Sequence, residues 1–348
     1  MDAFQLTAWQ HAPELRQVPD PDPGPGEVVV RIGGAGACHS DLHLIHDFPE
    51  GLVPWDMPFT LGHENAGWVE AVGPGGSRLE VGEPVAVYGA WGCGRCRRCR
   101  QGAENYCEDQ AVIGAMGPGL GRDGGMAERL LVPSDRYLVP LGDLDPVEAA
   151  PLTDAGLTPY HAVKRSLPLL VPGSTAVVIG VGGLGHMAVQ ILRELSPATI
   201  IAVDQRADAL ARATAGGADH AVLSGEDTDA AAEIKELTRD RGADLVIDVV
   251  GADATLALAA AVARPLGHIT IMGIAGGTLP LNFFGIGYEV SVATTYWGSM
   301  PELIEVVALA AAGRIRPHIQ RFTLDEAGAA YQAMHDGKLD GRAVIVPG

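Results

Sequence analysis

The sequence is poor in positive charge and in cysteine, and it has no long apolar run. Its 24 lysines and arginines face 43 aspartates and glutamates, so the formal net charge is −19. Such a charge repels nucleic-acid phosphates and anionic lipid surfaces. No apolar stretch is long enough to cross a bilayer, and the first residues lack the basic region and apolar core of a secretory signal. We therefore expect a cytoplasmic protein that binds neither nucleic acid nor membrane.

The remaining composition is that of a globular protein, with 47% hydrophobic and 19% charged residues. A chain of 348 residues is too long for one ordinary core, which favours two domains. The first part is rich in short β-type runs, at 27–32, 67–72 and 83–88. From residue 152 onward, apolar runs at 176–179, 200–204, 245–250 and 268–272 alternate with helical patterns. That alternation predicts an α/β fold with a doubly wound parallel sheet.

These patterns place a β-rich domain at 1–152 and the doubly wound domain at 153–290. The last part, 291–348, has two helix-like stretches, one of them an apolar run at 305–313, and a final strand at 343–346. The pattern alone does not decide whether this part extends the sheet or returns to the first domain.

The five cysteines are distributed unevenly. Cys93, Cys96, Cys99 and Cys107 form a C-x2-C-x2-C-x7-C loop, a spacing that can wrap one tetrahedral zinc ion. The fifth, Cys38, lies in a cluster of potential ligands, GACHSD. The sequence therefore predicts two metal positions, one closed and structural and one open, rather than disulfides.

A glycine-rich turn follows the run at 176–179. Gly180, Gly182 and Gly185 stand in G-x-G-x-x-G order before a helix with one apolar face. The first glycine permits a tight turn, the second lets the backbone approach a pyrophosphate, and the third lets helix and strand pack closely. The helix N-terminus then offers its N–H groups to phosphates. A glycine-rich turn without a ligand is the plainer alternative.

Asp204 ends the next apolar run, about twenty residues after the glycine motif. A carboxylate at this distance accepts hydrogen bonds from the ribose hydroxyls of the cofactor and repels a 2′-phosphate. This favours NAD, although Arg206 keeps NADP open because an arginine there can bind that phosphate. The predicted cofactor-binding residues are Gly180, Gly182, Gly183, Leu184, Gly185, Asp204 and Arg206.

Three places can supply ligands for the open metal site: Cys38, His63 with its neighbour Glu64, and Asp154. A catalytic zinc keeps three protein ligands and one exchangeable position. Taken singly, His63 also fits a structural histidine, and Cys38 also fits a small buried apolar residue. Spacing alone does not bring these residues together.

The motifs in combination resemble the zinc-containing medium-chain alcohol dehydrogenases, and most closely the bacterial NAD-dependent members that act on secondary alcohols and ketones. The resemblance covers essentially the whole chain. It rests on the four-cysteine loop with ACHSD (37–41), TLGHENAGWVEAVG (60–73), PLTDAGLTPYHA (151–162) and VIGVGGLG (178–185).

The resemblance implies a GroES-like catalytic domain at 1–152, to which residues 291–348 return, around a Rossmann NAD-binding domain at 153–290. The implied catalytic zinc ligands are Cys38 and His63. Many members have a cysteine as third ligand where this chain has Asp154, so the resemblance and the cysteine count both place Asp154 in the thiolate's position. Glu64 lies beside the metal in the family and is expected to bind it transiently.

The resemblance also implies the chemistry. Zinc polarises an alcohol oxygen, hydride passes to NAD, and Ser40 and His43 form a proton relay through the cofactor ribose; the alternatives are a helix cap for Ser40 and a surface side chain for His43. A hydrophobic substrate is expected, because the implied pocket residues are bulky and apolar. They are Trp55, Leu120, Phe284, Tyr296 and Trp297.

Several alternatives remain at this point. A polyol or aldehyde-specific zinc dehydrogenase is the main rival, and His39 fits either phosphate binding or a place in the pocket. A zinc-free, quinone-reductase-like member is disfavoured because it would lack the four-cysteine loop, and a nucleic-acid-binding zinc ribbon is disfavoured by the net charge. Family members are often tetramers, so we expect a homo-oligomer, tetramer or dimer.

Overall fold

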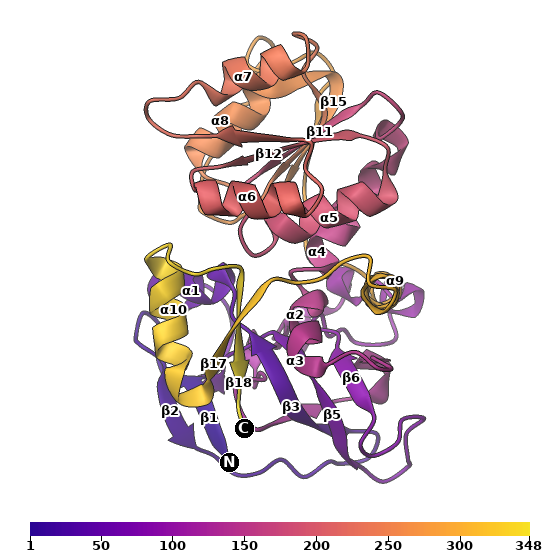
Figure 1. Ribbon diagram of the computed structural model, residues 1–348. Helices are drawn as coiled ribbons and strands as arrows, with labels where there is room; N and C mark the ends of the chain where they lie inside the picture. Colours follow the sequence, from indigo (N-terminus) through magenta and orange to yellow (C-terminus); the bar gives the residue numbers. More distant parts are fainter. The chain divides into compact units, whose positions relative to one another are not determined.

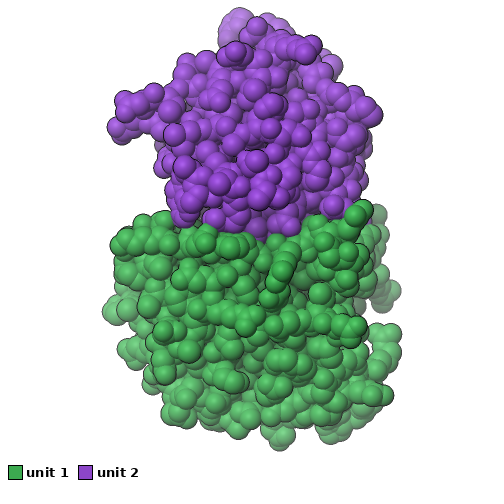
Figure 2. Space-filling view, viewed as in Figure 1, with its two compact units in different colours: residues 1–157, 297–348 green, residues 158–296 purple.

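The computed structural model describes residues 1–348, which divide into two compact units (Figure 2). Unit 1 comprises Met1–Leu157 and Trp297–Gly348, and unit 2 comprises Thr158–Tyr296. The C-terminal part of the chain therefore belongs to the unit formed by the N-terminal part. The divisions lie a few residues beyond the predicted ones at 152 and 291.

Unit 1 is built around a seven-stranded sheet of order β10-β6-β5-β3-β18-β17, with β9 also paired to β3. Its strands are β3 (Val28–Gly36), β5 (Glu64–Val72), β6 (Pro84–Val87), β9 (Arg129–Val132), β10 (Leu138–Pro140), β17 (Ile319–Thr323) and β18 (Arg342–Val346). The C-terminal strand β18 runs antiparallel to β3, with Val344 opposite Gly36. This pairing carries the chain end into the first unit and places Arg342 beside residues near position 36.

Smaller elements complete unit 1. A three-stranded sheet contains β1 (Asp2–Leu6), β2 (Glu14–Gln17) and β4 (Phe59–Thr60), and a two-stranded one contains β7 (Gly117–Pro118) and β8 (Gly121–Arg122). The α-helices are α1 (His39–His46), α2 (Gln110–Ile113), α3 (Pro146–Ala149), α9 (Met300–Ala311) and α10 (Ala327–His335). The 3-10 turns are η1 (Cys99–Gln101), η2 (Glu104–Tyr106), η3 (Asp135–Tyr137), η4 (Ala150–Thr153) and η6 (Leu324–Glu326). No helix of the structure combines the length and the apolar character that a membrane span requires.

Unit 2 is a six-stranded parallel sheet of order β13-β12-β11-β14-β15-β16. The strands are β11 (Thr175–Ile179), β12 (Thr199–Asp204), β13 (His220–Leu223), β14 (Ala243–Asp248), β15 (Ala263–Ile271) and β16 (Ser291–Thr294). In chain order this is 3-2-1-4-5-6, the order of doubly wound dinucleotide-binding sheets. The strand order therefore confirms the predicted fold class.

Helices cover both faces of this sheet. Figure 1 shows α5 (Gly185–Leu195) and α6 (Ala207–Ala215) on one face, and α7 (Ala230–Leu237) and α8 (Asp253–Val262) on the other. The unit also contains η5 (Leu167–Leu169) and most of α4 (Leu157–Ser166). Because the sheet is covered twice, β11 and β14 are buried along their whole length. This double burial explains why they read as continuous apolar runs in the sequence.

Two strands of unit 2 differ from the sequence-based assignment. Residues 291–294 were expected to begin the return to the first domain, but they form β16 and pair in parallel with β15. The other, β13, was not predicted, because of its four residues only Val222 is buried. Both strands lie at an edge of the sheet, where partial exposure removes the apolar pattern that marks a central strand.

Candidate active site

Three side chains that are far apart in the sequence meet in unit 1. Cys38 is the N-cap of α1, His63 immediately precedes β5, and Asp154 follows η4. Their ligand atoms all lie within 4.8 Å of one another. Oδ2 of Asp154 is 3.8 Å from Sγ of Cys38 and 3.5 Å from Nε2 of His63. One thiolate, one imidazole and one carboxylate converging in this way suit a zinc ion with an open fourth position.

Asp41 lies behind the imidazole and was missed in the sequence. Its Oδ1 is 3.0 Å from Nδ1 of His63, which leaves Nε2 on the side of the other two ligands. Its Oδ2 accepts hydrogen bonds from the backbone N–H of Cys38 at 2.9 Å and from the hydroxyl of Tyr331 at 2.8 Å. A carboxylate in this position orients a histidine ligand and makes it more basic. The available signal was its place three residues after the N-cap Cys38.

The charges around His63 favour its protonated form. Burial opposes that charge, but Asp41 together with hydrogen bonds to Asp154 and Asp41 outweighs burial and raises the pKa of His63 well above its usual range. For Tyr331, burial and the Asp41 carboxylate raise the pKa well above its usual value. Tyr331 therefore remains a hydrogen-bond donor to Asp41. A metal ion that binds His63 must displace a proton from it.

A second buried carboxylate, Glu64, is held by an arginine from the far end of the chain. Arg342 donates from Nε to Oε2 of Glu64 at 2.9 Å and from Nη2 to Oε1 at 2.6 Å. The backbone N–H of Ala155 donates to Oε1 at 2.9 Å. Gly36 makes room for this pair, because a Cβ at position 36 would lie 1.9 Å from Oε2. Both oxygens of Glu64 are thus engaged within the protein.

Arg342 also faces the candidate metal ligand Asp154, whose Oδ2 lies 3.6 Å from Nη2. Burial opposes the charge of Arg342, but Cys38 and Glu64 outweigh burial and raise its pKa well above its usual value. Burial raises the pKa of Glu64, and Arg342 opposes that shift. Nothing in the sequence indicated Arg342. It reaches the site through the pairing of β18 with β3.

The two residues of the predicted relay lie on α1. Oγ of Ser40 is 3.4 Å from Nε2 of His63, so its hydroxyl is beside this candidate metal ligand. His43 lies one helical turn further along, and its Nδ1 is 2.5 Å from Oδ2 of Asp47. This contact engages one ring nitrogen of His43 and leaves the other available. His39 is exposed at the start of the same helix.

The predicted pocket residues are distributed over both units. Trp297 is buried, donates from Nε1 to the carbonyl of Thr153 at 3.0 Å and packs edge-on against the His63 ring. Trp55 lies over Gly121, next to Leu120. Tyr296 and Phe284 belong to unit 2. There the Phe284 ring is 87% exposed and packs against Phe283.

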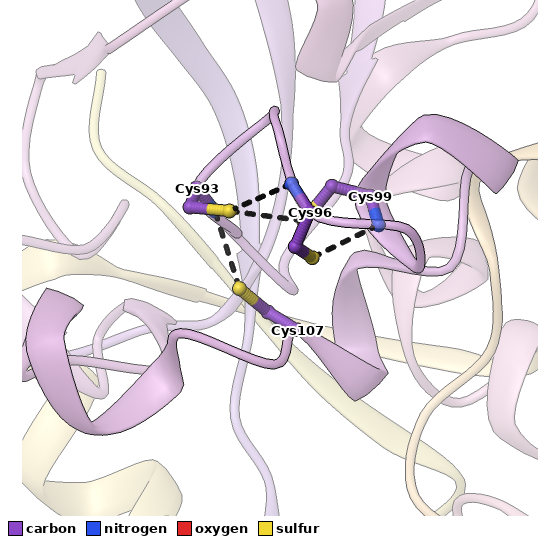
Figure 3. Close-up of side chains that lie close together, drawn as sticks. All are labelled: Cys93, Cys96, Cys99 and Cys107. Atoms are coloured by element: carbon purple, nitrogen blue, oxygen red, sulfur yellow. Dashed lines mark hydrogen bonds between the residues drawn. The ribbon is translucent and has the colours of Figure 1, made fainter.

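The four remaining cysteines gather into one cluster (Figure 3). Backbone N–H groups point at the sulfurs: Cys96 donates to Sγ of Cys93, Cys99 to Sγ of Cys96, and Cys93 to Sγ of Cys107, over 3.3 to 3.4 Å. The four Sγ atoms lie within 4.8 Å of one another. Backbone N–H groups, that of Cys99 foremost, lower the pKa of Cys96 to about 6. Four thiolates in this geometry fit a closed zinc site.

The glycine loop of unit 2 has the conformation that the motif predicts. Gly180 has a φ of +85°, which favours glycine, and no atom lies within 4 Å of where a Cβ on Gly182 would stand. A Cβ on Gly185 would lie 1.9 Å from the carbonyl oxygen of Gly180. The loop therefore turns tightly, leaves its backbone open at Gly182 and packs closely at Gly185. Gly183 and Leu184 complete the turn into α5, and these features fit a dinucleotide pyrophosphate.

Comparison with known proteins agrees with this geometry. Residues 24–143 match the alcohol dehydrogenase GroES-like domain, and residues 183–312 match the zinc-binding dehydrogenase domain. The chain is 37% identical over 355 residues to an NAD-dependent alcohol dehydrogenase of Sulfurisphaera tokodaii, and the match covers 100% of both chains. It is 36% identical over 349 residues to the D-arabinose 1-dehydrogenase (NADP(+)) of Saccharolobus solfataricus, covering 99% of this chain and 97% of that one.

Solved structures give the same result. The alcohol dehydrogenase from the hyperthermophilic archaeon Aeropyrum pernix has a TM-score of 0.92 and 38% identity, with 100% of both chains covered. The resemblance inferred from the motifs and the predicted GroES-like and Rossmann-type folds are thus confirmed. The chain belongs to the zinc-binding, medium-chain family of alcohol dehydrogenases.

Proposed function

We propose that this protein interconverts hydrophobic secondary alcohols and ketones with NAD(H), using a zinc ion held by Cys38, His63 and Asp154. The observation that carries the proposal is the convergence of these three ligand atoms within 4.8 Å. Thiolate and carboxylate together balance the charge of Zn²⁺, so the ligand set suits the ion. When bound, zinc supplies a Lewis acid toward the substrate oxygen, and NAD supplies a hydride acceptor.

The chain's own residues position the substrate and move its proton. Ser40, beside His63, accepts the proton of the alcohol while releasing its own hydroxyl proton toward His43, which passes a proton to solvent; the contact with Asp47 orients the His43 ring. Trp297, buried against His63, provides an apolar wall, and the family resemblance assigns Trp55 and Leu120, also in unit 1, to the substrate pocket. Such a wall binds alkyl or aryl groups better than the hydroxyls of a polyol.

Ser40→Ala should lower kcat about 100-fold at neutral pH while the zinc content stays unchanged, because proton transfer of this kind contributes on that scale. Ser40→Thr, which keeps a hydroxyl, is the matched control and should retain most of the rate. Steady-state kinetics from pH 6 to 10 with zinc analysis test the role. A Ser40→Ala enzyme with the parent's kcat at every pH would exclude Ser40 from the relay.

The experiment for the function is a substrate panel followed at the NADH absorbance: 2-alkanols, primary alcohols, polyols and aryl ketones. The proposal expects the highest kcat/KM for 2-alkanols and aryl ketones. A second candidate is a polyol or sugar dehydrogenase, favoured by the 36% identity to D-arabinose 1-dehydrogenase (NADP(+)). Higher kcat/KM for polyols or sugars would favour that candidate and contradict the first. Preference for aldehydes and primary alcohols would likewise contradict a secondary-alcohol enzyme.

We also propose two zinc ions per subunit, the second one structural and held by the four-cysteine loop. That loop packs onto the start of α9, where the N–H of Met300 donates to the carbonyl of Gly102 at 2.8 Å. Its arrangement is thereby coupled to the fold of unit 1.

Cys99→Ser should release this structural zinc and lower the melting temperature, because buried Cys99 is one of four ligands. The variant should keep one zinc per subunit and residual activity at low temperature. Elemental analysis and calorimetry test this. Cys38→Ser is the reciprocal control: it should abolish activity and leave the melting temperature closer to that of the parent. A Cys99→Ser protein as heat-stable as the parent would contradict a structural role.

Zinc affinity of the catalytic site should fall as the pH falls. His63 binds zinc only when neutral, and its pKa is raised well above the usual range, chiefly by Asp41 acting against burial. Protons therefore compete with zinc below that raised pKa, and affinity should increase with pH through neutrality. Chelator competition from pH 6 to 8 measures the dependence. Asp41→Asn should weaken zinc binding and shift to lower pH the range over which zinc affinity increases. The same pH range in both proteins would contradict the role of Asp41.

We propose a cytoplasmic homo-oligomer, a tetramer or a dimer. All five cysteines are free thiols suited to metal binding, and unit 2 exposes large apolar side chains such as Phe283 and Phe284. Light scattering coupled to size exclusion measures the subunit number. A monomer at micromolar concentration would contradict this part of the proposal.

A further inference from the structure

The region after β12 holds two acids and one arginine beside the glycine loop. Asp204 ends the strand, and its carboxylate accepts hydrogen bonds from the backbone N–H of Val181 at 2.8 Å and of Arg206 at 2.9 Å. Val181 lies inside the glycine loop, so these bonds tie the acid to the turn that receives the cofactor phosphates. Each carboxylate oxygen accepts more than one hydrogen bond, so Asp204 can still bind the ribose hydroxyls.

The side chain of Arg206 is paired with a different acid. Its Nε donates to Oδ1 of Asp208 at 3.1 Å, and its Nη2 contacts Oδ2 of the same carboxylate. The arrangement is a two-pronged arginine–carboxylate pair, which directs a planar guanidinium strongly. A second arginine, Arg212, lies 4.0 Å from Oδ2 of Asp208 on the next turn of α6. The hydrogen bond from Arg206 lowers the pKa of Asp208 to about 2, so the acid is ionised at neutral pH.

We propose that Asp208 is a specificity-determining residue for the cofactor: it binds the guanidinium of Arg206 and thereby competes with the 2′-phosphate of NADP(H). The inference rests on the dinucleotide binding that is part of the proposed function. An arginine just beyond the ribose-binding acid is the group that can bind a 2′-phosphate. Discrimination against NADP(H) then has two sources, repulsion by Asp204 and occupation of Arg206 by Asp208.

Because both acids act against the same phosphate, the effects of Asp204→Gly and Asp208→Ala on NADPH affinity should not be additive. The Arg206–Asp208 pair is substantially exposed, with side-chain exposures of 36% and 56%, so solvent weakens it and breaking it alone has a modest effect. Asp208→Ala should therefore raise NADPH affinity only about twofold while Asp204 still repels the phosphate. Once Asp204→Gly removes that repulsion, Asp208→Ala should raise NADPH affinity by about 3- to 5-fold, the largest gain that release of an exposed ion pair allows.

The test is calorimetric titration of the full-length protein with NADH and with NADPH, which measures binding without turnover. The variants are Asp208→Ala, Asp204→Gly and the double variant, each also made in an Arg206→Ala background. The proposal expects the gain in NADPH affinity from Asp208→Ala only where Arg206 is present. An equal gain without Arg206 would show a general charge effect and overturn it, as would no gain on the Asp204→Gly background. A parent that binds neither cofactor would refute the proposed function itself, which separates the two failures.

Discussion

Replacing Asp154 by asparagine should remove the catalytic zinc and lower turnover about 100-fold or more, since even residues behind the ligands contribute 10- to 100-fold in this kind of site. The carboxylate supplies one of two negative charges that balance the ion, and asparagine supplies none. Oδ2 of Asp154 is also close to Cys38, His63 and Arg342, at 3.8, 3.5 and 3.6 Å. The neutral variant therefore loses a charged ligand and one of the two carboxylates that face the buried guanidinium of Arg342.

Asp154→Cys is the matched control, because it restores a negatively charged ligand of the kind that many family members have at this place. We expect it to retain zinc and a larger share of the parent's rate than Asp154→Asn. Elemental analysis should give one zinc per subunit for Asp154→Asn, held by the four cysteines, against two for the parent. Full zinc content together with the parent's kcat in Asp154→Asn would remove Asp154 from the site.

The sequence predicted the parts of the site whose chemistry is local. The four-cysteine loop and the glycine turn are each contained in one short segment, and the structure folds both as their spacing implies. Cys38, His63 and Asp154 required the family resemblance, because their meeting depends on three separate elements. The central strands of unit 2 were predicted for a similar reason: burial on both faces makes each one a continuous apolar run.

The groups behind the ligands could not be predicted, because they are positioned by long-range pairing. Tyr331 reaches Asp41 over 290 residues, and Arg342 reaches Glu64 over 278. Each is an ordinary residue in its local sequence. Only the antiparallel pairing of β18 with β3 brings Arg342 to the candidate metal ligands. The edge strands β13 and β16 escaped prediction because they are short and largely or partly exposed.

Arg342→Met should cause the largest loss of stability among the variants considered. Arg342 is 2% exposed and Glu64 is fully buried, so removing the guanidinium leaves a buried carboxylate whose remaining partner is the N–H of Ala155. Breaking a buried ion pair on one side costs about 3–5 kcal/mol. For a unit of this size, that corresponds to a melting temperature lower by roughly 10 °C.

The double variant Arg342→Met/Glu64→Gln distinguishes the loss of the ion pair from the loss of side-chain packing at position 342. It removes the unpaired charge together with the guanidinium, so it should recover more than half of the lost stability. Arg316→Met is the surface control: Arg316 pairs with Glu148 at 3.0 Å but is largely exposed, and such pairs contribute about 0–1 kcal/mol. Calorimetry at one scan rate, with zinc content measured in parallel, compares the variants. If Arg342→Met melted no lower than Arg316→Met, the Arg342–Glu64 pair would not make the contribution to stability that a buried ion pair makes.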